Sequence, residues 1–291
     1  MIIAIDVGGT KISAALMDHG EIIEQRKADS VIHTDLKNLA DYLVKLCQGW
    51  AEKAEQVAIA STGQVSKEYV NFISAKLKLP LKTQLEAGFN LPVTILNDAA
   101  AAAWAEYCTE KSTTANIEKS ADTLVYITVS TGIGGGMIQN GQLVTSSDGF
   151  CAHLGHTSVQ NLSGELIKCT CGRINCVEAV TSGTAIAKQA SKILNKEVSC
   201  KDVFQQYIEL PEIAQLIDNC TSAFADLIAN VKATTGTQKV ILGGSVGSAP
   251  LFAQQVKEKV ARLSEIYQLT IIPPQCGADA DLIGAYYYVS K

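Results

Sequence analysis

Three cysteines and one histidine form a dense group of side chains that can bind a metal ion. Cys169, Cys171 and Cys176 follow a Cys-x-Cys-x4-Cys spacing, and His156 stands shortly before them. Three thiolates and one imidazole make the closed tetrahedral set that a structural zinc ion needs. The alternative is that the three thiols are inert buried side chains. We predict a structural zinc ion, which leaves no open position for chemistry at the metal.

Glycine-rich segments at residues 6–11, 130–136 and 243–245 form a second group. Glycine lets backbone amides approach phosphate oxygens closely. A single Gly-Gly turn is an ordinary hairpin feature, but three such segments favour a nucleotide triphosphate site. The first segment lies between two predicted strands, which excludes a Walker A loop and a Rossmann fingerprint because both lead into a helix. The predicted phosphate-binding residues are Gly8, Gly9, Thr10, Lys11, Thr131, Gly132, Gly134, Gly135, Gly243, Gly244 and Ser245.

Asp98 is the candidate for the base of a phosphoryl transfer. It follows an apolar strand predicted over residues 92–96 and precedes an alanine-rich helix predicted over residues 99–107. Phosphoryl transfer needs positioning, charge neutralisation and one base for the attacking hydroxyl. Asn97 and Asp98 are equally suited to cap the helix that follows them. The residue types alone therefore leave a catalytic and a capping role open.

The elements that must position these residues occur twice along the chain. A strand, a glycine-rich turn, a second strand and a tight turn follow one another over residues 2–23 and again over residues 124–144. The repeat predicts a duplicated α/β fold whose two lobes enclose a cleft. We predict an N-terminal lobe over residues 1–115, joined by part of the last helix at about 281–291. The second lobe, residues 116–280, carries the zinc-binding loop.

Composition excludes several classes of protein. The chain of 291 residues has 24 Lys and Arg against 29 Asp and Glu, a net charge of −5, so it lacks the basic face that binds nucleic acid or anionic membranes. No uncharged apolar stretch reaches the roughly 18–20 residues of a membrane span. The first residues have no basic segment like that of a signal peptide. We expect a cytoplasmic protein without nucleic-acid or membrane partners.

The chain resembles the ROK family of sugar kinases. Residues 6–11, 130–136, 154–156 and 169–176 match the signatures of that family in the expected order. The resemblance implies a duplicated actin-like, ribonuclease H-like ATPase fold that phosphorylates hexoses and N-acetylhexosamines with ATP and Mg²⁺. It also implies a homodimer, a base at Asp98, magnesium and the ATP phosphates near Asp6, and zinc on the four residues named above. The implied sugar-binding residues are Ser61, Gly63, Asn97, Asp98, His153, His156 and Glu178.

Two residues depart from the family pattern. His153 replaces the first glutamate of a Glu-x-Gly-His segment that binds sugar hydroxyls, and Asn175 replaces a glycine beside the last cysteine. A carboxylate only accepts hydrogen bonds, whereas neutral imidazole donates one and accepts another. We expect the sugar contact to differ from that of a glucokinase, unless His153 is only a loop residue. Asparagine tolerates the left-handed conformation, so we expect the cysteine loop to be preserved.

Several stretches, among them residues 59–63 and 128–136, look closest to bacterial members that phosphorylate N-acetylmannosamine at the 6-hydroxyl in sialic acid breakdown. A glucokinase or an N-acetylglucosamine kinase is the alternative, and His153 counts against the former. The family also contains sugar-responsive repressors with a DNA-binding domain before the first glycine loop. Because that loop starts at residue 6 here, we expect an enzyme.

Overall fold

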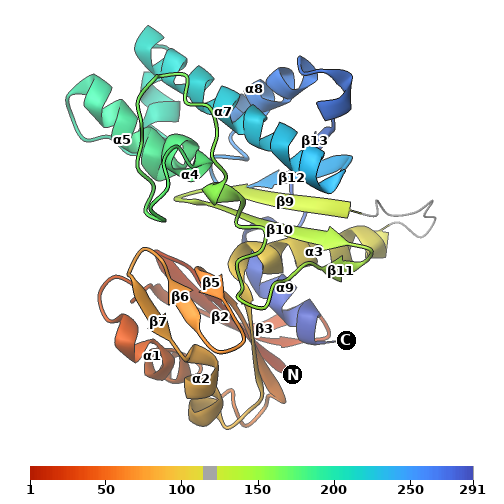
Figure 1. Cartoon of the computed structure of the whole chain (residues 1–291). Helices are drawn as coiled ribbons and strands as arrows, with labels where there is room; N and C mark the ends of the chain where they lie inside the picture. The colour runs from red at the N-terminus through yellow and green to blue at the C-terminus, as the bar shows by residue number, and fades with distance from the viewer. Residues whose placement is uncertain (114–122, 291) are drawn as a thin grey trace.

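Two five-stranded sheets with the same topology form the framework of the protein (Figure 1). The computed structural model describes residues 1–113 and 123–290, so the predicted lobe boundary at residues 115 and 116 lies outside the described residues. The strand orders are β3-β2-β1-β4-β8 and β11-β10-β9-β12-β13. In each sheet an antiparallel meander is followed by two strands parallel to its first strand. The predicted duplication of an α/β unit is confirmed.

The strand bounds show where the repeats lie. The first sheet contains β1 (Ile2–Val7), β2 (Lys11–Asp18), β3 (Glu21–Asp29), β4 (Gln56–Ser61) and β8 (Val93–Asn97). The second contains β9 (Thr123–Val129), β10 (Ile133–Gln139), β11 (Gln142–Leu143), β12 (Lys239–Gly243) and β13 (Thr270–Ile272). A small third sheet, β5 (Gln64–Val65), β6 (Val70–Phe72) and β7 (Leu77–Leu79), follows β4 and was not predicted.

Apolar residues at successive positions of the central strands explain why both faces of each sheet are covered. In β1, Ile3 and Ile5 face a core with α1 (Leu39–Leu46) and α2 (Leu81–Phe89), whereas Ile2 and Ala4 face a second core. Successive residues of a strand point to opposite faces, so a strand that is apolar throughout is buried on both sides. β9 repeats this pattern, with Val125 and Ile127 in the largest core of the protein.

Helices α3 (Asp98–Thr113) and α9 (Ala280–Val289) form a layer between the two sheets (Figure 1). α3 follows the first sheet but packs mainly on β10 and β9, and α9 comes last but packs on β1 and β4. The two helices approach closely because a Cβ on Gly284 would lie 1.8 Å from the carbonyl oxygen of Ala101. Each sheet is therefore covered by a helix from the other half of the sequence.

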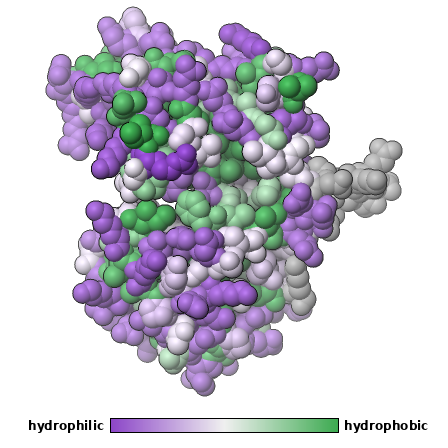
Figure 2. Space-filling view, in the orientation of Figure 1, coloured by the Kyte–Doolittle hydropathy of each residue, from purple (hydrophilic) through white to green (hydrophobic). Residues whose placement is uncertain are grey.

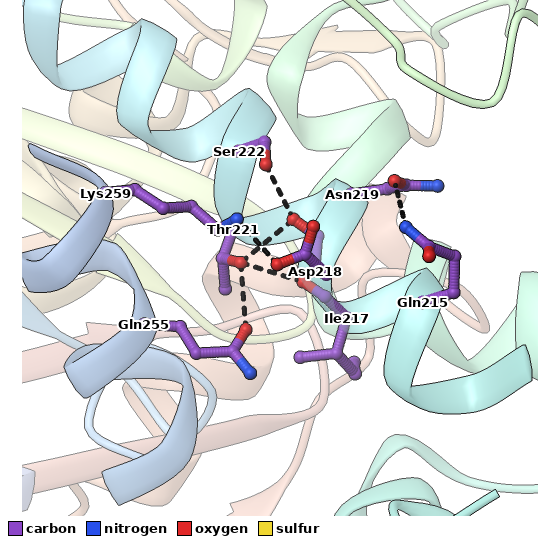
Figure 3. Close-up of polar contacts among 8 residues, drawn as sticks. All are labelled: Gln215, Ile217, Asp218, Asn219, Thr221, Ser222, Gln255 and Lys259. Carbon is purple, nitrogen blue, oxygen red and sulfur yellow. Dashed lines mark hydrogen bonds and ion pairs between the residues drawn. The ribbon is translucent and has the colours of Figure 1, made fainter. Parts of the chain in front are cut away.

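The outer face of the second sheet carries the remaining helices. They are α4 (Val177–Thr181), α5 (Gly183–Leu194), α6 (Cys200–Asp202), α7 (Pro211–Thr235) and α8 (Pro250–Ala261). α7 and α8 share the T-shaped pair Phe224 and Phe252 in the core. Polar contacts also join them: Lys259 Nζ lies 2.6 Å from Asp218 Oδ1, and Thr221 donates to Gln255 Oε1 at 3.0 Å (Figure 3). No helix within the described part of the chain has the length and apolar character of a membrane span.

The glycine-rich segment at 130–136 is shorter as a turn than we predicted. β10 begins at Ile133, so Gly134, Gly135 and Gly136 belong to a strand paired with β9. A Cβ on Gly136 would lie 2.6 Å from Cβ of Ala103, and one on Gly134 would lie 2.9 Å from Cβ of Ala99. Gly134 and Gly136 thus let α3 lie directly on one face of the strand, whereas Gly135 faces Ala152 and Leu154 on the other. The turn itself comprises only residues 130–132.

Candidate active site

Asp98 lies where β8 ends and α3 begins, between the ends of β4 and the second sheet. Its Oδ1 accepts from the Ala99 N–H at 2.8 Å, and the neighbouring Asn97 caps the helix by accepting from the Ala100 N–H at 3.2 Å. The side-chain amide of Asn97 donates to the Gly63 carbonyl at 3.1 Å. Asn97 therefore takes the capping role that the residue types left open between it and Asp98.

Burial raises the pKa of Asp98 above that of an ordinary aspartate. Hydrogen bonds from the Ala99 N–H and from the side chains of Asn97 and Thr62 oppose this rise without cancelling it. Desolvation disfavours the ionised carboxylate, whereas donors that bind it favour ionisation. Such a carboxylate is more basic than a free one, which suits proton abstraction near neutral pH.

A group of aspartates surrounds this position. Burial, and then the charges of Asp98 and Asp279, raise the pKa of Asp6 to about 7. Burial raises the pKa of Asp281, and the negative charges of Asp6, Asp98 and Asp279 raise it further. Asp6 lies near the end of β1, Asp279 directly precedes α9, and Asp281 lies in the first turn of that helix. Mutual repulsion among carboxylates at close range marks a place that a cation would stabilise, and Mg²⁺ prefers oxygen ligands.

Replacing Asp6 with asparagine is expected to stabilise the magnesium-free protein at alkaline pH. An unfolded aspartate ionises near pH 3.9, but folded Asp6 keeps its proton up to about pH 7. Stability from this group is therefore lost as pH rises from about 4 to 7. Because Asp6 is partly exposed, we expect the Asp6→Asn change to raise the free energy of unfolding at pH 8 by about 1–3 kcal/mol.

Urea denaturation at pH 4.5 and pH 8 in the presence of a chelator measures this effect. The exposed Asp41 is the control, because it lies outside the aspartate group and its replacement by asparagine leaves the repulsion within that group unchanged. For each variant, the difference in unfolding free energy from the wild type is compared at pH 8 and at pH 4.5. The prediction is contradicted if this difference changes with pH by the same amount in Asp6→Asn and in Asp41→Asn.

Two of the predicted phosphate loops lie side by side in the second half. The Val129 carbonyl accepts from the Val246 and Gly247 N–H groups at 2.9 and 3.1 Å, which joins residues 130–132 to residues 243–247. Gly244 has φ +83° and a Cβ there would lie 2.3 Å from the Val129 oxygen, so only glycine fits. The Ser130 carbonyl accepts from the N–H of Gly183 at the start of α5. The third predicted loop closes the β1–β2 hairpin.

The predicted phosphate-binding residues differ in exposure. Gly9, Thr10 and Lys11 are exposed at the tip of the β1–β2 hairpin, where the Gly8 N–H donates to the Lys11 carbonyl at 3.0 Å. Thr131 and Ser245 are exposed at the tips of the two other loops, whereas Gly243 is buried. Gly134 and Gly135 lie inside β10 against Ala99, Ala152 and Leu154, so packing accounts for their lack of a side chain. Their role in phosphate binding stays a prediction.

The predicted sugar-binding residues form two sets. Ser61, Gly63, Asn97 and Asp98 come from adjoining ends of β4 and β8, where Ser61 and Asn97 are register partners. His153, His156 and Glu178 come from the second half, where Oε2 of Glu178 accepts from the Ile133 N–H at 3.0 Å. Gly134 touches Ala99, which brings the start of α3 beside the strand that begins at Ile133. The molecular surface is hollowed between the two halves (Figure 2).

The ring of His153 lies in a stack of aromatic side chains. Burial lowers its pKa, with a hydrogen bond to the Gly149 carbonyl and the charge of Glu178 acting in the opposite sense. Its ring stacks on Phe150 at 4.6 Å between centroids, and on His156 at 6.3 Å.

The predicted metal ligands converge. The ligand atoms of His156, Cys169, Cys171 and Cys176 all lie within 4.8 Å of one another. Cys171 Sγ is 3.6 Å from Cys176 Sγ, and Cys169 Sγ is 3.7 Å from His156 Nδ1. A tetrahedron with normal zinc bond lengths has edges of roughly 3.6–3.8 Å. The four side chains therefore fit a zinc ion. Asn175 has φ +52°, so it adopts the left-handed conformation we expected of it.

Sequence reasoning missed two parts of this region. Asp281 belonged to the predicted last helix, but nothing placed that helix next to Asp6 and Asp98. The segment 146–150 also carried no recognisable motif, yet Gln64 of β5 donates to the Asp148 carbonyl at 2.9 Å across the two halves. A signal for the first was the pair of aspartates at the start of the last helix, a position favourable to carboxylates in any protein.

The fold and this arrangement are those of a sugar kinase of the actin-like ATPase type, and the ROK family model matches residues 2–291. The chain belongs to the ROK family. It is 32% identical to the N-acetylmannosamine kinase of Vibrio cholerae (strain M66-2) over 98% of both chains. It is 37% identical to the N-acetylmannosamine kinase of Haemophilus influenzae (strain PittEE), over 99% of this chain and 94% of the relative.

Solved structures confirm the fold. A ROK family glucokinase from Streptomyces griseus, in complex with glucose and AMPPNP, matches with a TM-score of 0.80 and 25% identity, over 99% of this chain and 98% of that one. The ROK hexokinase from Thermus thermophilus matches with a TM-score of 0.78 and 23% identity over the same shares of the two chains. The predicted actin-like architecture is thus confirmed.

Proposed function

We propose that this chain is a transferase that moves the γ-phosphate of ATP to the 6-hydroxyl of N-acetylmannosamine. The observation that carries the kinase chemistry is a single one: Asp98, with a raised pKa, stands at the end of β8 within the aspartate group. The names of the full-length relatives at 32–37% identity support N-acetylmannosamine as the sugar. His153, in place of an acceptor-only carboxylate, supports a sugar other than glucose.

In this proposal Asp98 accepts the proton of the 6-hydroxyl as that oxygen attacks the γ-phosphorus. The bond from the γ-phosphorus to the β,γ-bridging oxygen breaks, and ADP leaves with the electron pair. Thr62 and Asn97 hold the carboxylate by hydrogen bonds, so it keeps its orientation as it gains the proton. General base catalysis of this kind contributes about 10²–10⁴-fold in rate.

The phosphates of ATP would lie along the loops at residues 8–11, 130–132 and 243–245. Backbone N–H groups of such loops bind phosphate oxygens without a charged side chain. Asp6 and Asp281 are the residues that would hold Mg²⁺, in part through water molecules. When bound, the ion neutralises charge on the phosphates. The raised pKa of Asp6 fits this role because the folded protein leaves its carboxylate uncompensated.

Zinc is proposed as a structural ion on His156, Cys169, Cys171 and Cys176. All four ligand positions are filled by the protein, so a bound ion stabilises the loop and takes no part in the transfer. Val177 follows Cys176 directly and begins α4, which contains Glu178. His153 lies three residues before His156. The ion would therefore fix the distance between the sugar-binding His153 and Glu178.

The resemblance also implies a cytoplasmic homodimer, and both points stay predictions. A cytoplasmic location is in keeping with the use of ATP, and the proposed partners are small molecules only, the sugar and the nucleotide. Size-exclusion chromatography with light scattering measures the mass in solution and tests the dimer.

The substrate is tested by ADP release with Mg-ATP over four sugars. These are N-acetylmannosamine, N-acetylglucosamine, mannose and glucose. We expect kcat/KM to be highest for N-acetylmannosamine, by about tenfold or more over the other three, because groups left unpaired in the site penalise the wrong sugar. Mannose isolates the acetamido group and N-acetylglucosamine isolates the configuration at carbon 2. Preference for glucose or N-acetylglucosamine would favour the alternative kinase and contradict the proposed substrate.

A further inference from the structure

Residues 146–150 of the second half contact the first half beside the predicted sugar-binding residues. Gln64 Nε2 donates to the Asp148 carbonyl at 2.9 Å. Next to it, a Cβ on Gly149 would lie 1.9 Å from the Val65 carbonyl oxygen and 2.8 Å from the Ser66 nitrogen. The backbones of the two halves thus touch directly. Gly149 has φ +75°, so both its conformation and its surroundings require glycine.

This segment, residues 146–150, is ordered by its own side chains. Asp148 Oδ1 accepts from the Ser146 hydroxyl at 2.7 Å and from the Phe150 N–H at 3.0 Å. An aspartate that binds the backbone two residues later makes a local turn that does not depend on a ligand. The segment therefore presents the Asp148 and Gly149 carbonyl groups in fixed directions.

The same segment determines the hydrogen bonding of His153. The ring nitrogen Nε2 lies 3.1 Å from the Gly149 carbonyl oxygen, and Phe150 stacks on the ring. A carbonyl only accepts, so Nε2 carries the hydrogen and the neutral ring has Nδ1 as its acceptor. Nδ1 has no hydrogen-bond partner within the described part of the protein. Imidazole has an N–H donor that a carboxylate lacks. In His153 this donor is used within the protein, on the Gly149 carbonyl, and is not available to the sugar.

We propose that Gly149 and Gln64 are positioning residues that hold His153 with Nδ1 as an acceptor for a sugar hydroxyl. The inference rests on the proposed sugar kinase function and names how that site recognises its substrate. His153 offers the sugar the same acceptor as a carboxylate, without the negative charge. Because Gln64 follows Gly63, which binds Asn97, contacts run continuously from His153 to the segment that carries Asp98.

Gly149→Ala tests the contact, and Gly164→Ala is its matched control. Gly164 has the same φ of +75°, but a Cβ there meets nothing within 4 Å. Both variants carry the same backbone strain, and only the first pushes the two halves apart. We expect Gly149→Ala to raise KM for the sugar by about tenfold or more while KM for ATP changes less than about twofold. Gly164→Ala is expected to keep both values within about twofold.

The measurement uses whichever of the four sugars turns over fastest. A preference for another sugar would then overturn the proposed substrate without affecting this test. Equal sugar KM values for the two alanine variants would overturn the role of Gly149. If Gly149→Ala does not fold, Gln64→Glu serves instead. Glutamate keeps the oxygen that accepts from Asn71 but loses the N–H that donates to the Asp148 carbonyl, so the change acts on the contact between the halves. We expect its sugar KM to rise about 3–10-fold.

Substitutions at His153 test its hydrogen-bonding state. His153→Gln keeps one donor for the Gly149 carbonyl and one acceptor for the sugar, whereas His153→Glu has only acceptors and faces the carbonyl with a negative charge. We expect the glutamine variant to retain about tenfold more kcat/KM than the glutamate variant. A glutamate variant as active as the glutamine variant would show that the Gly149 carbonyl does not determine which nitrogen of the His153 ring carries the hydrogen.

Discussion

Asp98→Asn is expected to lower kcat by about 10²–10⁴-fold while KM for the sugar changes by less than about threefold. Asparagine has the same shape and accepts the Ala99 N–H as aspartate does, but it cannot take a proton from the attacking hydroxyl. The variant is not expected to be less stable, since burial raises the pKa of Asp98 and the amide avoids that desolvation. Steady-state ADP release with circular dichroism measures both properties.

The pH dependence of the wild-type enzyme provides a second readout of the same residue. A base with a raised pKa loses activity at higher pH than an ordinary aspartate, so we expect kcat/KM to fall as pH decreases below neutral. Asp41→Asn, in the first turn of α1, is the control for an aspartate at a helix start. If Asp98→Asn keeps the activity of Asp41→Asn, another group is the base.

Zinc removal is expected to have the second large effect. Purified protein should contain one zinc ion per chain, and Cys171→Ser should lower this content below about a tenth and the Tm by about 10 °C. Structural zinc contributes folding energy directly, and serine is a poor zinc ligand. KM for the sugar should rise because His156, a proposed zinc ligand, lies three residues after His153.

Elemental analysis and thermal unfolding measure this effect with Cys200→Ser as the control. Cys200 is also partly buried, but its thiol lies outside the group of four ligands. We expect Cys200→Ser to keep the zinc and to change the Tm by only about 1–3 °C. A wild-type protein without zinc, whose Tm a chelator leaves unchanged, would contradict the structural role.

Local patterns predicted the framework of this protein well. Alternating apolar residues on either side of the glycine turn at residues 6–11 indicated the first hairpin, and the same order at residues 124–144 indicated its repeat. The spacing of Cys169, Cys171 and Cys176 predicted a group of ligands that the fold brings together. Such signals are readable because each depends on residues that are neighbours in the sequence.

Contacts between distant residues were not readable in this way. The glycines of β10 look like those of a phosphate loop, but Gly134 and Gly136 lie against Ala99 and Ala103 of a helix that the sequence places earlier. The proximity of Asp281 to Asp6 depends on α9 returning to the first sheet. The fit of Gly149 against Val65 likewise depends on how the two halves meet.

The exchange of α3 and α9 between the halves sets an order for folding during synthesis. Leu282 and Ala285 of α9 cover Ile2 and Ala4 of the first sheet. This face of the sheet therefore stays uncovered while the ribosome makes the residues between the end of β8 at Asn97 and α9, which are more than half of the chain. At about 5–20 residues per second this delay lasts on the order of 10–40 seconds. During that time an apolar sheet face is open to chaperones or to other nascent chains. The second half can close over α3 first, so we expect the N-terminal half to become protease-resistant last.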